Sequence, residues 1–163
     1  AIKADIASAS AVREAQTVMA SLNKKAKRAA EGCRISACTD ITGFGLLGHC
    51  AEMASASEVT FELKVRDIAY FEDAIDYAKM GLVPAGTYKN RGYSGQKVDA
   101  GSVEEYYLDL LYDPQTSGGL LFSVAREDLG TLLQNLEKAG MDTAVSVIGT
   151  VEPKSDKLIR LSL

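Results

Sequence analysis

Some residue types are scarce in this sequence, which has no tryptophan, a single histidine and three cysteines among its 163 residues. The cysteines lack C-x-x-C spacing, and one histidine adds too few ligands to complete a zinc site. His49 and Cys50 are neighbours in the sequence. Adjacent positions on a helix point about 100° apart, so these two side chains do not form a catalytic dyad. We therefore expect three reduced thiols, the usual state of cysteine in the cytoplasm.

Long apolar runs and an excess of positive charge are also absent. No run approaches the ~20 residues of a membrane-spanning helix, and no signal-peptide pattern opens the chain. The net charge is −4, whereas nucleic-acid-binding domains usually carry a basic surface. Hydrophobic residues make up 47% and charged residues 25%, which is typical of a globular domain. We expect residues 1–163 to form one cytoplasmic domain that binds neither membranes nor nucleic acids.

Hydrophobic periodicity indicates which segments are regular. Helices are predicted over 8–30, 44–56, 67–80, 103–112 and 126–140. Ser8 or Ser10 is the candidate N-cap of the first helix, and Gly140 is expected to end the last one. Strands are predicted over 35–38, 58–65, 120–124, 144–151 and 158–163. The strand at 120–124 is apolar enough to be central, and the last strand is expected at an edge. This order predicts an α/β sandwich, with one mixed sheet of about five strands flanked by helices.

Residues 84–102 differ from the rest of the chain. This segment contains few aliphatic side chains and holds Gly86, Lys89, Arg91, Gly92, Gly95, Lys97 and Gly101. A loop of this length inside a compact domain is usually either functional or disordered. The composition predicts a flexible glycine-rich loop, which either wraps a phosphate group or forms a surface insert.

The chemistry concentrates in residues 39–49, where a predicted strand leads through Thr39-Asp40 into glycines at 43, 45 and 48 and then a helix. That order places backbone N–H groups and a helix N-terminus beside a carboxylate. The glycine spacing also matches the dinucleotide-binding fingerprint. However, Asp40 would repel a bare pyrophosphate, and no regular βαβ units follow. A Mg²⁺ ion between Asp40 and phosphate would fit this turn, while an Asx cap on the helix is the alternative role for this residue.

Three segments resemble, in the same order, motifs of the selenophosphate synthetase (selenide, water dikinase) family. They are Thr39-Asp-Ile-Thr-Gly-Phe-Gly-Leu-Leu-Gly-His49, Pro84-Ala-Gly-Thr-Tyr-Lys-Asn90 and Asp113-Pro-Gln-Thr-Ser-Gly-Gly-Leu-Leu121. The resemblance covers essentially the whole chain, but only the C-terminal half of the family's enzyme. It implies an α/β fold partly like the ferredoxin topology. It also implies a cytoplasmic, homodimeric enzyme that makes selenophosphate, AMP and phosphate from selenide, ATP and water.

The resemblance also implies roles for particular residues. Asp40 would be a Mg²⁺ ligand that bridges to the phosphates of ATP. The residues that would contact the nucleotide are Thr42, Gly43, Gly45, Lys89, Thr116, Ser117 and Gly118. Taken alone, residues 116–119 suit an unusual strand entry as well as a cleft, and the resemblance favours the cleft.

No catalytic residue is expected in this chain, because the family's reactive segment lies in an N-terminal domain. We therefore expect that domain to be the partner and the chain alone to be inactive, since phosphoryl transfer depends on a complete site. Two alternatives keep the scaffold: a non-catalytic module that binds a protein partner, and a synthetase domain acting on a purine precursor. The upstream reading frame distinguishes the first alternative from an enzyme.

Overall fold

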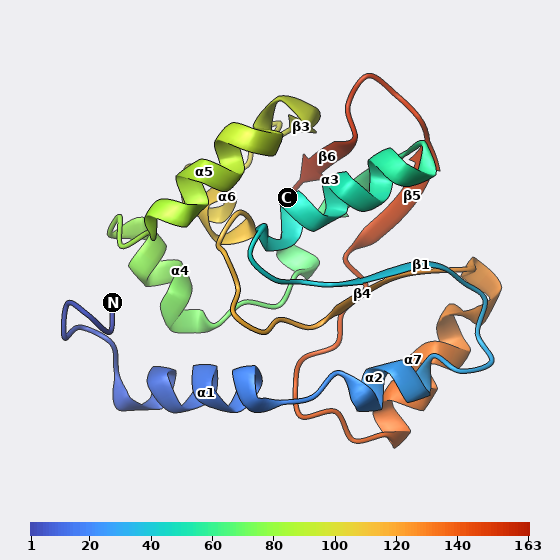
Figure 1. Ribbon diagram of the computed structural model, residues 1–163, viewed down its shortest axis with the longest axis horizontal. Helices are drawn as coiled ribbons and strands as arrows, with labels where there is room; N and C mark the ends of the chain where they lie inside the picture. The colour runs from blue at the N-terminus through green and yellow to red at the C-terminus, as the bar shows by residue number, and fades with distance from the viewer.

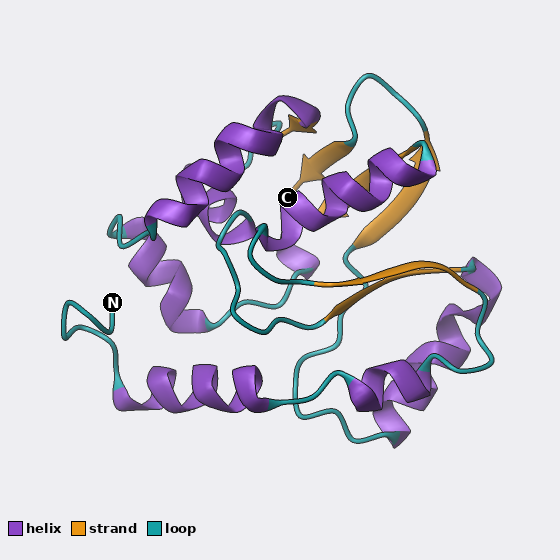
Figure 2. Ribbon diagram, in the orientation of Figure 1, coloured by secondary structure: helices purple, strands orange, loops and turns teal.

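Two β-sheets organise the computed structural model, which describes all 163 residues (Figures 1 and 2). The larger sheet has the strand order β3-β6-β2-β5. In it, β2 runs antiparallel to β5 and parallel to β6, and β6 runs parallel to β3. The smaller sheet is the antiparallel pair β1-β4. The strands are β1 (Ile35–Asp40), β2 (Val59–Lys64), β3 (Val98–Asp99), β4 (Leu120–Val124), β5 (Gly149–Pro153) and β6 (Ile159–Ser162).

The α/β class is confirmed, but the strands do not all join one sheet of about five. The mixed sheet has four strands, with β6 inside it between β3 and β2 instead of at an edge. The apolar strand β4 is not central, because its only partner is β1. Its side chains divide between two cores: Leu121 packs on the larger core, and Leu120 and Phe122 pack on the smaller one. The apolar character of β4 predicted that its side chains are buried, but not which core they pack against.

The larger core lies between the inner face of the mixed sheet and the helices that cover it. It joins α3 (Gly45–Ser57) and α6 (Glu105–Leu111) to β2 and β6. Phe61 and Leu63 alternate with exposed Glu62 and Lys64 along β2, the period-2 pattern of a half-buried strand. Figure 1 shows α3 crossing in front of this sheet. Helix α3 therefore begins at the glycine turn and ends over the core, which fixes the position of the turn.

A smaller core lies beside the β1-β4 pair. Its buried members come from α2 (Lys24–Ala29) and α7 (Leu129–Lys138), and they are Ala26, Ala29, Ala30, Leu132 and Leu136. A short 3₁₀ turn, Arg126–Asp128, precedes α7. Gly140, with a φ of +57°, follows the helix as the sequence predicted.

The predicted helix over 8–30 is two helices, α1 (Ala9–Ala20) and α2. Ser8 caps α1 as expected, because its Oγ accepts a hydrogen bond from the backbone N–H of Ala11 at 3.0 Å. The chain becomes extended at Ser21. Asn23 then donates from Nδ2 to the backbone oxygen of Gly118 at 3.1 Å. This long-range contact sits at the break, and local periodicity carries no sign of it.

The prediction of an irregular loop over 84–102 is wrong. These residues form α5 (Ala85–Ser94), a 3₁₀ turn and β3. Thr87 and Ser94 are buried, so α5 has an inward face although it has few aliphatic side chains. A Cβ added to Gly86 would lie 2.7 Å from Cγ of Pro114. Glycine was therefore a sign of close helix packing here, and not of a missing helix.

Two other boundaries differ from the prediction. The helix expected over 67–80 is a 3₁₀ turn, Val65–Asp67, followed by α4 (Glu72–Lys79). The strand expected over 144–151 begins only at Gly149, and the valines before it at 145 and 147 are exposed. A Cβ at Gly149 would lie 2.0 Å from the backbone oxygen of Glu62. The pairing with β2 thus needs glycine at this point.

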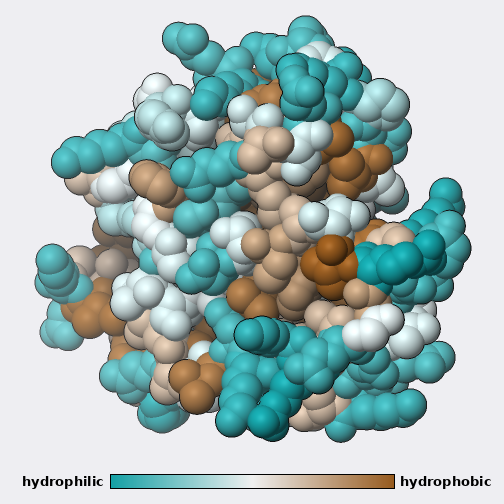
Figure 3. All heavy atoms as spheres, turned by 45° about the vertical axis from the view of Figure 1, so that its right-hand side comes forward, coloured by the Kyte–Doolittle hydropathy of each residue, from teal (hydrophilic) through white to brown (hydrophobic).

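The surface and the thiols are ordinary for such a fold. Figure 3 shows one face on which hydrophobic patches alternate with hydrophilic side chains. All three cysteines are free, as predicted. No helix is long and apolar enough to cross a membrane.

Candidate functional site

The two longer motifs, residues 39–49 (the first motif) and 113–121 (the second motif), lie against each other in the structure. The backbone N–H of Ile41 donates to the oxygen of Gly119 at 2.9 Å, and the N–H of Gly118 donates back to the oxygen of Ile41 at 3.0 Å. The N–H of Gln115 donates to the oxygen of Thr42 at 3.0 Å. These bonds continue the β1-β4 pairing beyond the ends of both strands, so residues 40–45 and 113–119 form one unit (Figure 1).

Glycine is required where the two motifs approach most closely. Gly45 has a φ of +69°, and an added Cβ would lie 2.7 Å from the carbonyl carbon of Tyr112. An added Cβ at Gly118 would lie 2.4 Å from the oxygen of Ile41. Both glycines were predicted to contact a nucleotide. Their first role in the structure is to let the two backbones touch, since distances below 3 Å leave no room for a side chain.

The third motif, residues 84–90, joins the same unit through α5. Asn90 donates from Nδ2 to the backbone oxygens of Gly43 and Tyr112, both at 2.9 Å. It thus ties α5 to the glycine turn and to the end of α6. The sequence analysis quoted Asn90 within a motif and gave it no role. All three motifs, predicted from separate parts of the sequence, meet here.

The cations of α5 are used differently. Arg91 forms an ion pair with Glu105 of α6, including a contact of 3.1 Å between Nη2 and Oε2. Hydrogen bonding within this pair raises the pKa of Arg91 and lowers that of Glu105. Lys89 is exposed and is in none of the ion pairs of the chain. Of the two, Lys89 is therefore the cation left for a ligand.

Backbone amides at the start of α3 are the best-placed donors. Helix α3 begins after Phe44, and no side chain caps it. At this end of the helix, the N–H groups that make no hydrogen bond within the chain are those of Gly43, Phe44, Leu46 and Leu47. Leu47 is fully buried, so the first three are the ones a ligand can reach. Unpaired amides at a helix N-terminus carry partial positive charge and favour an anion. Of the three turn residues predicted to contact the nucleotide, Gly43 keeps a free N–H, whereas those of Thr42 and Gly45 are engaged within the chain.

A buried histidine engages the Thr42 amide. Nε2 of His49 lies 3.1 Å from the backbone nitrogen of Thr42 and 3.1 Å from its Oγ1. Nδ1 of the same ring lies 3.2 Å from Oε2 of Glu52, one turn further along α3. The sequence alone excluded His49 as a zinc ligand and as half of a catalytic dyad, and it suggested no other role. His49 lies one turn into α3, where a side chain can reach back to the residues before the helix, and this position was the available sequence signal.

Asp40 stands at the end of β1 with its side chain exposed. It does not cap α3, which removes the structural alternative for this carboxylate. No group of three or more His, Cys, Asp or Glu side chains lies close enough to hold a metal ion. A Mg²⁺ ion bound by one carboxylate and by phosphate oxygens would still fit the residues present. Any other protein ligands would have to come from outside this chain.

Three further residues of the second motif differ in exposure. Thr116 is exposed, and Ser117 is half-buried. Burial raises the pKa of the Asp113 carboxyl to about 6. The main chain of Asp113 lies at the contact with Gly45, so this carboxyl belongs to the assembled turn. The sequence analysis placed Asp113 in a motif without assigning it a function.

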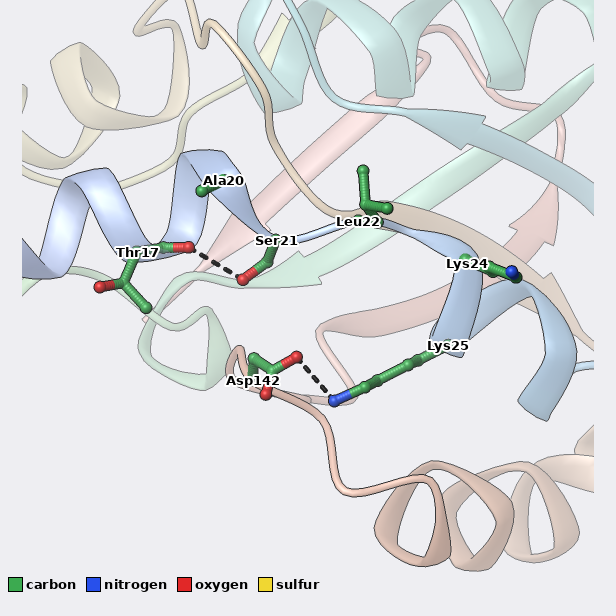
Figure 4. Close-up of a pocket in the computed structure, with 7 residues that line it drawn as sticks. All are labelled: Thr17, Ala20, Ser21, Leu22, Lys24, Lys25 and Asp142. Carbon is green, nitrogen blue, oxygen red and sulfur yellow. Dashed lines mark hydrogen bonds and ion pairs between the residues drawn. The ribbon is translucent and has the colours of Figure 1, made fainter.

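A separate hollow of about 560 Å³ is lined by no residue of these motifs (Figure 4). It is open to solvent between the end of α1, the start of α2 and a loop in which Asp142 pairs with Lys25 at 2.7 Å. Its lining residues are Thr17, Ala20, Ser21, Leu22, Lys24, Lys25 and Asp142. None of the predicted site residues lines it. The candidate site is therefore the surface around the glycine turn and not this hollow.

Residues 3–161 match a family model described as AIR synthase related protein, C-terminal domain. The chain is 43% identical over 158 residues to selenide, water dikinase 2 of Peptoclostridium acidaminophilum, which covers 97% of this chain and 45% of that protein. It is 40% identical to selenide, water dikinase of Treponema denticola, over 99% of this chain and 47% of that protein. The corresponding protein of Clostridioides difficile is 46% identical over 87% of this chain and 41% of its own length. The chain thus spans about half the length of these curated relatives.

Proposed function

Because this chain belongs to the AIR synthase related family as a C-terminal domain, we propose that it is the C-terminal domain of a selenide, water dikinase. The parent enzyme is an ATP-dependent phosphotransferase that makes selenophosphate, AMP and phosphate from selenide, ATP and water. The observation that carries this proposal is the convergence of three separate motifs on one glycine turn. The names of relatives up to 46% identical support the same assignment.

In this proposal the chain binds the phosphate end of ATP. The unpaired amides from Gly43 onward and the N-terminus of α3 supply hydrogen bonds and partial positive charge. Lys89 adds an exposed positive charge from α5. The hydroxyls of Thr116 and Ser117 lie on the loop that pairs with the turn and are further candidates for phosphate contacts.

Asp40 is the residue that we propose as a magnesium ligand. Bound Mg²⁺ would neutralise charge on the phosphates during transfer. The pairing of β1 with β4 fixes the backbone of Asp40, and its exposed carboxylate can reach an ion without rearrangement of the fold. Mg²⁺ usually binds through one or two carboxylates with phosphates and water completing its shell.

The rest of the site is proposed to come from an N-terminal domain, in a homodimeric cytoplasmic enzyme. Phosphoryl transfer gains its rate from positioning and charge neutralisation, both of which need all the parts together. The 163-residue chain alone is therefore expected to turn over no ATP. A non-catalytic module built on this scaffold is the competing function, and a purine-precursor synthetase is the competing chemistry.

The test is an assay of selenide-dependent AMP release by the full-length protein that carries this chain. We expect activity in the wild type and a loss of at least about 100-fold in Asp40→Asn, by analogy with the loss of a principal electrostatic contact. The matched control is Asp76→Asn, which removes an exposed carboxylate of α4. Absence of AMP release from folded wild-type protein would favour the non-catalytic module, and turnover that needs a purine precursor in place of selenide would favour the synthetase.

A further inference from the structure

Behind the glycine turn lies a chain of three polar groups that ends on Thr42. We propose that His49 is a positioning residue, which fixes the Thr42 backbone and presents the Thr42 hydroxyl to a phosphate oxygen, with Glu52 setting the position of the imidazole proton. This inference rests on the proposed function for its ligand. The geometry itself depends only on this chain: the imidazole is buried, at 8% exposure, and contacts Thr42 through one nitrogen and Glu52 through the other.

The donor at Thr42 determines the protonation of the ring. A backbone N–H can only donate, and it points at Nε2 of His49 from 3.1 Å. Nε2 must therefore carry its lone pair, and the single proton of the neutral imidazole lies on Nδ1. The carboxylate of Glu52, 3.2 Å from Nδ1, favours a proton on that side. Two contacts on opposite sides of the ring thus select the same tautomer.

The backbone of Thr42 is held at both its N–H and its C=O group. Its N–H donates to His49, and its oxygen accepts from the N–H groups of Gly45 and Gln115, at 3.1 and 3.0 Å. The Gly45 contact closes the turn, the Gln115 contact joins it to the second motif, and the histidine joins it to α3. Loss of the imidazole acceptor would leave the Thr42 amide without its hydrogen-bond partner, while the oxygen contacts remained.

The hydroxyl of Thr42 is the group left for a ligand. Nε2 has one lone pair, and both the N–H and Oγ1 lie 3.1 Å from it. The fixed amide hydrogen takes that acceptor, whereas the hydroxyl hydrogen can rotate about its C–O bond toward an oxygen outside. Thr42 is half-buried, so the hydroxyl can be reached from the surface that carries Gly43 and Asp40.

A packing role for the ring makes a different prediction. The Phe44 ring lies 5.5 Å from the imidazole, so another ring of similar size in place of His49 could fill the space. If His49 only fills space, His49→Phe should preserve binding. If it positions Thr42, an acceptor at the place of Nε2 is needed, which glutamine can supply and phenylalanine cannot.

The first experiment uses nitrogen-15 NMR of the 163-residue chain. The imidazole shifts should report a proton on Nδ1 and a lone pair on Nε2, with the Thr42 amide signal displaced by its hydrogen bond. The Thr42 signal should move in His49→Phe and stay near its place in His49→Gln. A proton on Nε2 in the wild type, or an unmoved Thr42 amide in His49→Phe, would overturn the proposal.

The second experiment measures kcat and KM for ATP in the full-length protein. We expect His49→Phe to lower kcat/KM about tenfold or more, the size of one lost hydrogen bond to a charged group. His49→Gln should recover activity to within about threefold, and Thr42→Val should resemble His49→Phe. Equal activity of His49→Phe and wild type would overturn the proposal.

Failure of the proposed function would look different from failure of this inference. A wild-type protein without selenide-dependent turnover contradicts the proposed function, while the NMR result still decides whether His49 holds Thr42. If His49→Phe does not fold, the comparison of Thr42→Val with His49→Gln decides the activity arm: full activity in Thr42→Val would overturn the role of the hydroxyl.

Discussion

Helix α1 and the glycine turn are attached to the molecule in different ways. The turn over residues 42–45 has backbone hydrogen bonds to the second motif, a side-chain bond from Asn90 and no room for a Cβ at Gly45. Helix α1 has no buried residue, and its N-terminal cap is held by exposed contacts such as that of Ser8 with Asp73 at 2.8 Å. The proposed function belongs to the turn, where the backbone contacts make small displacements costly in folding free energy. The following expectations test that contrast, beginning with the largest effect.

Gly45→Ala should unfold or severely destabilise the chain. The new Cβ would meet the Tyr112 carbonyl carbon at 2.7 Å, and a φ of +69° is itself unfavourable for alanine. We expect a loss of about 3 kcal/mol or more in the free energy of unfolding, measured by urea denaturation. The control is Gly92→Ala in α5, where a Cβ has no neighbour within 4 Å. That change should be neutral or stabilise by up to about 1 kcal/mol, and equal losses in both variants would contradict the contrast.

Leucine-to-alanine substitutions should have very different effects on stability in α3 and next to α1. Leu47, two residues after the first residue of α3, is fully buried, whereas Leu22, just beyond α1, is 77% exposed. Leu47→Ala should cost about 3 kcal/mol because it removes buried contacts and leaves a cavity. Leu22→Ala should change the free energy of unfolding by less than about 0.5 kcal/mol. A large loss at Leu22 would show that α1 is packed in solution more tightly than in the structure.

Asp113→Asn should make the stability of the turn less dependent on pH. The folded-state pKa of Asp113 is raised to about 6 by burial, above the value of about 3.9 for an unfolded chain. The ionised form is thus disfavoured in the fold, so this residue costs stability above pH 6 and costs nothing below pH 4. We expect the variant to be more stable than wild type by about 1 kcal/mol at pH 7.5, a figure reduced for partial exposure.

The difference between Asp113→Asn and wild type should shrink toward zero as the pH falls to 4 and below, where the Asp113 carboxyl is protonated in the fold and increasingly in the unfolded chain. Urea denaturation at pH 4, 6 and 7.5 measures it, with Asp76→Asn as the control for removing a carboxylate. A variant that loses stability at pH 7.5 would mean that the Asp113 carboxylate has a stabilising partner in solution.

Asp40→Asn should have the smallest effect on the fold. Its side chain is exposed and caps no helix. The free energy of unfolding should therefore change by about 0.5 kcal/mol or less, as for a typical surface variant, with a correspondingly small shift in melting temperature. Differential scanning calorimetry of the 163-residue chain measures this. A loss above about 2 kcal/mol would give Asp40 a structural role that the contacts do not reveal.

The sequence analysis was most accurate where a local pattern had a local cause. The alternation in β2 and the helical spacing after Phe44 gave correct elements, because each depends on one buried face. The cap at Ser8 and the glycine stop at Gly140 were also correct. The motifs drew attention to the right part of the chain, although the sequence analysis assigned no role there to His49, Asn90 or Asp113.

The sequence analysis was wrong where glycine or polar residues served a distant contact. Gly86 lies in a helix and leaves room for Pro114 to pack against it, and the chain is extended at Ser21 just before Asn23 reaches Gly118. The edge position expected for the last strand was wrong as well, because β6 lies between β3 and β2. These contacts join residues far apart in the sequence, and no local window contains both partners.

By itself, the sequence determined the α/β class, most of the regular elements and the glycine turn that begins α3, because apolar spacing and backbone freedom act within a few residues. Only the tertiary structure decided that β1 and β4 form a separate pair, and that this pairing brings Gly118 to Ile41 and the second motif to the first. It also turned His49 toward Thr42 and left Lys89 without an ion-pair partner. Strand pairing and close packing are settled by which surfaces can be buried together, a property of the whole chain.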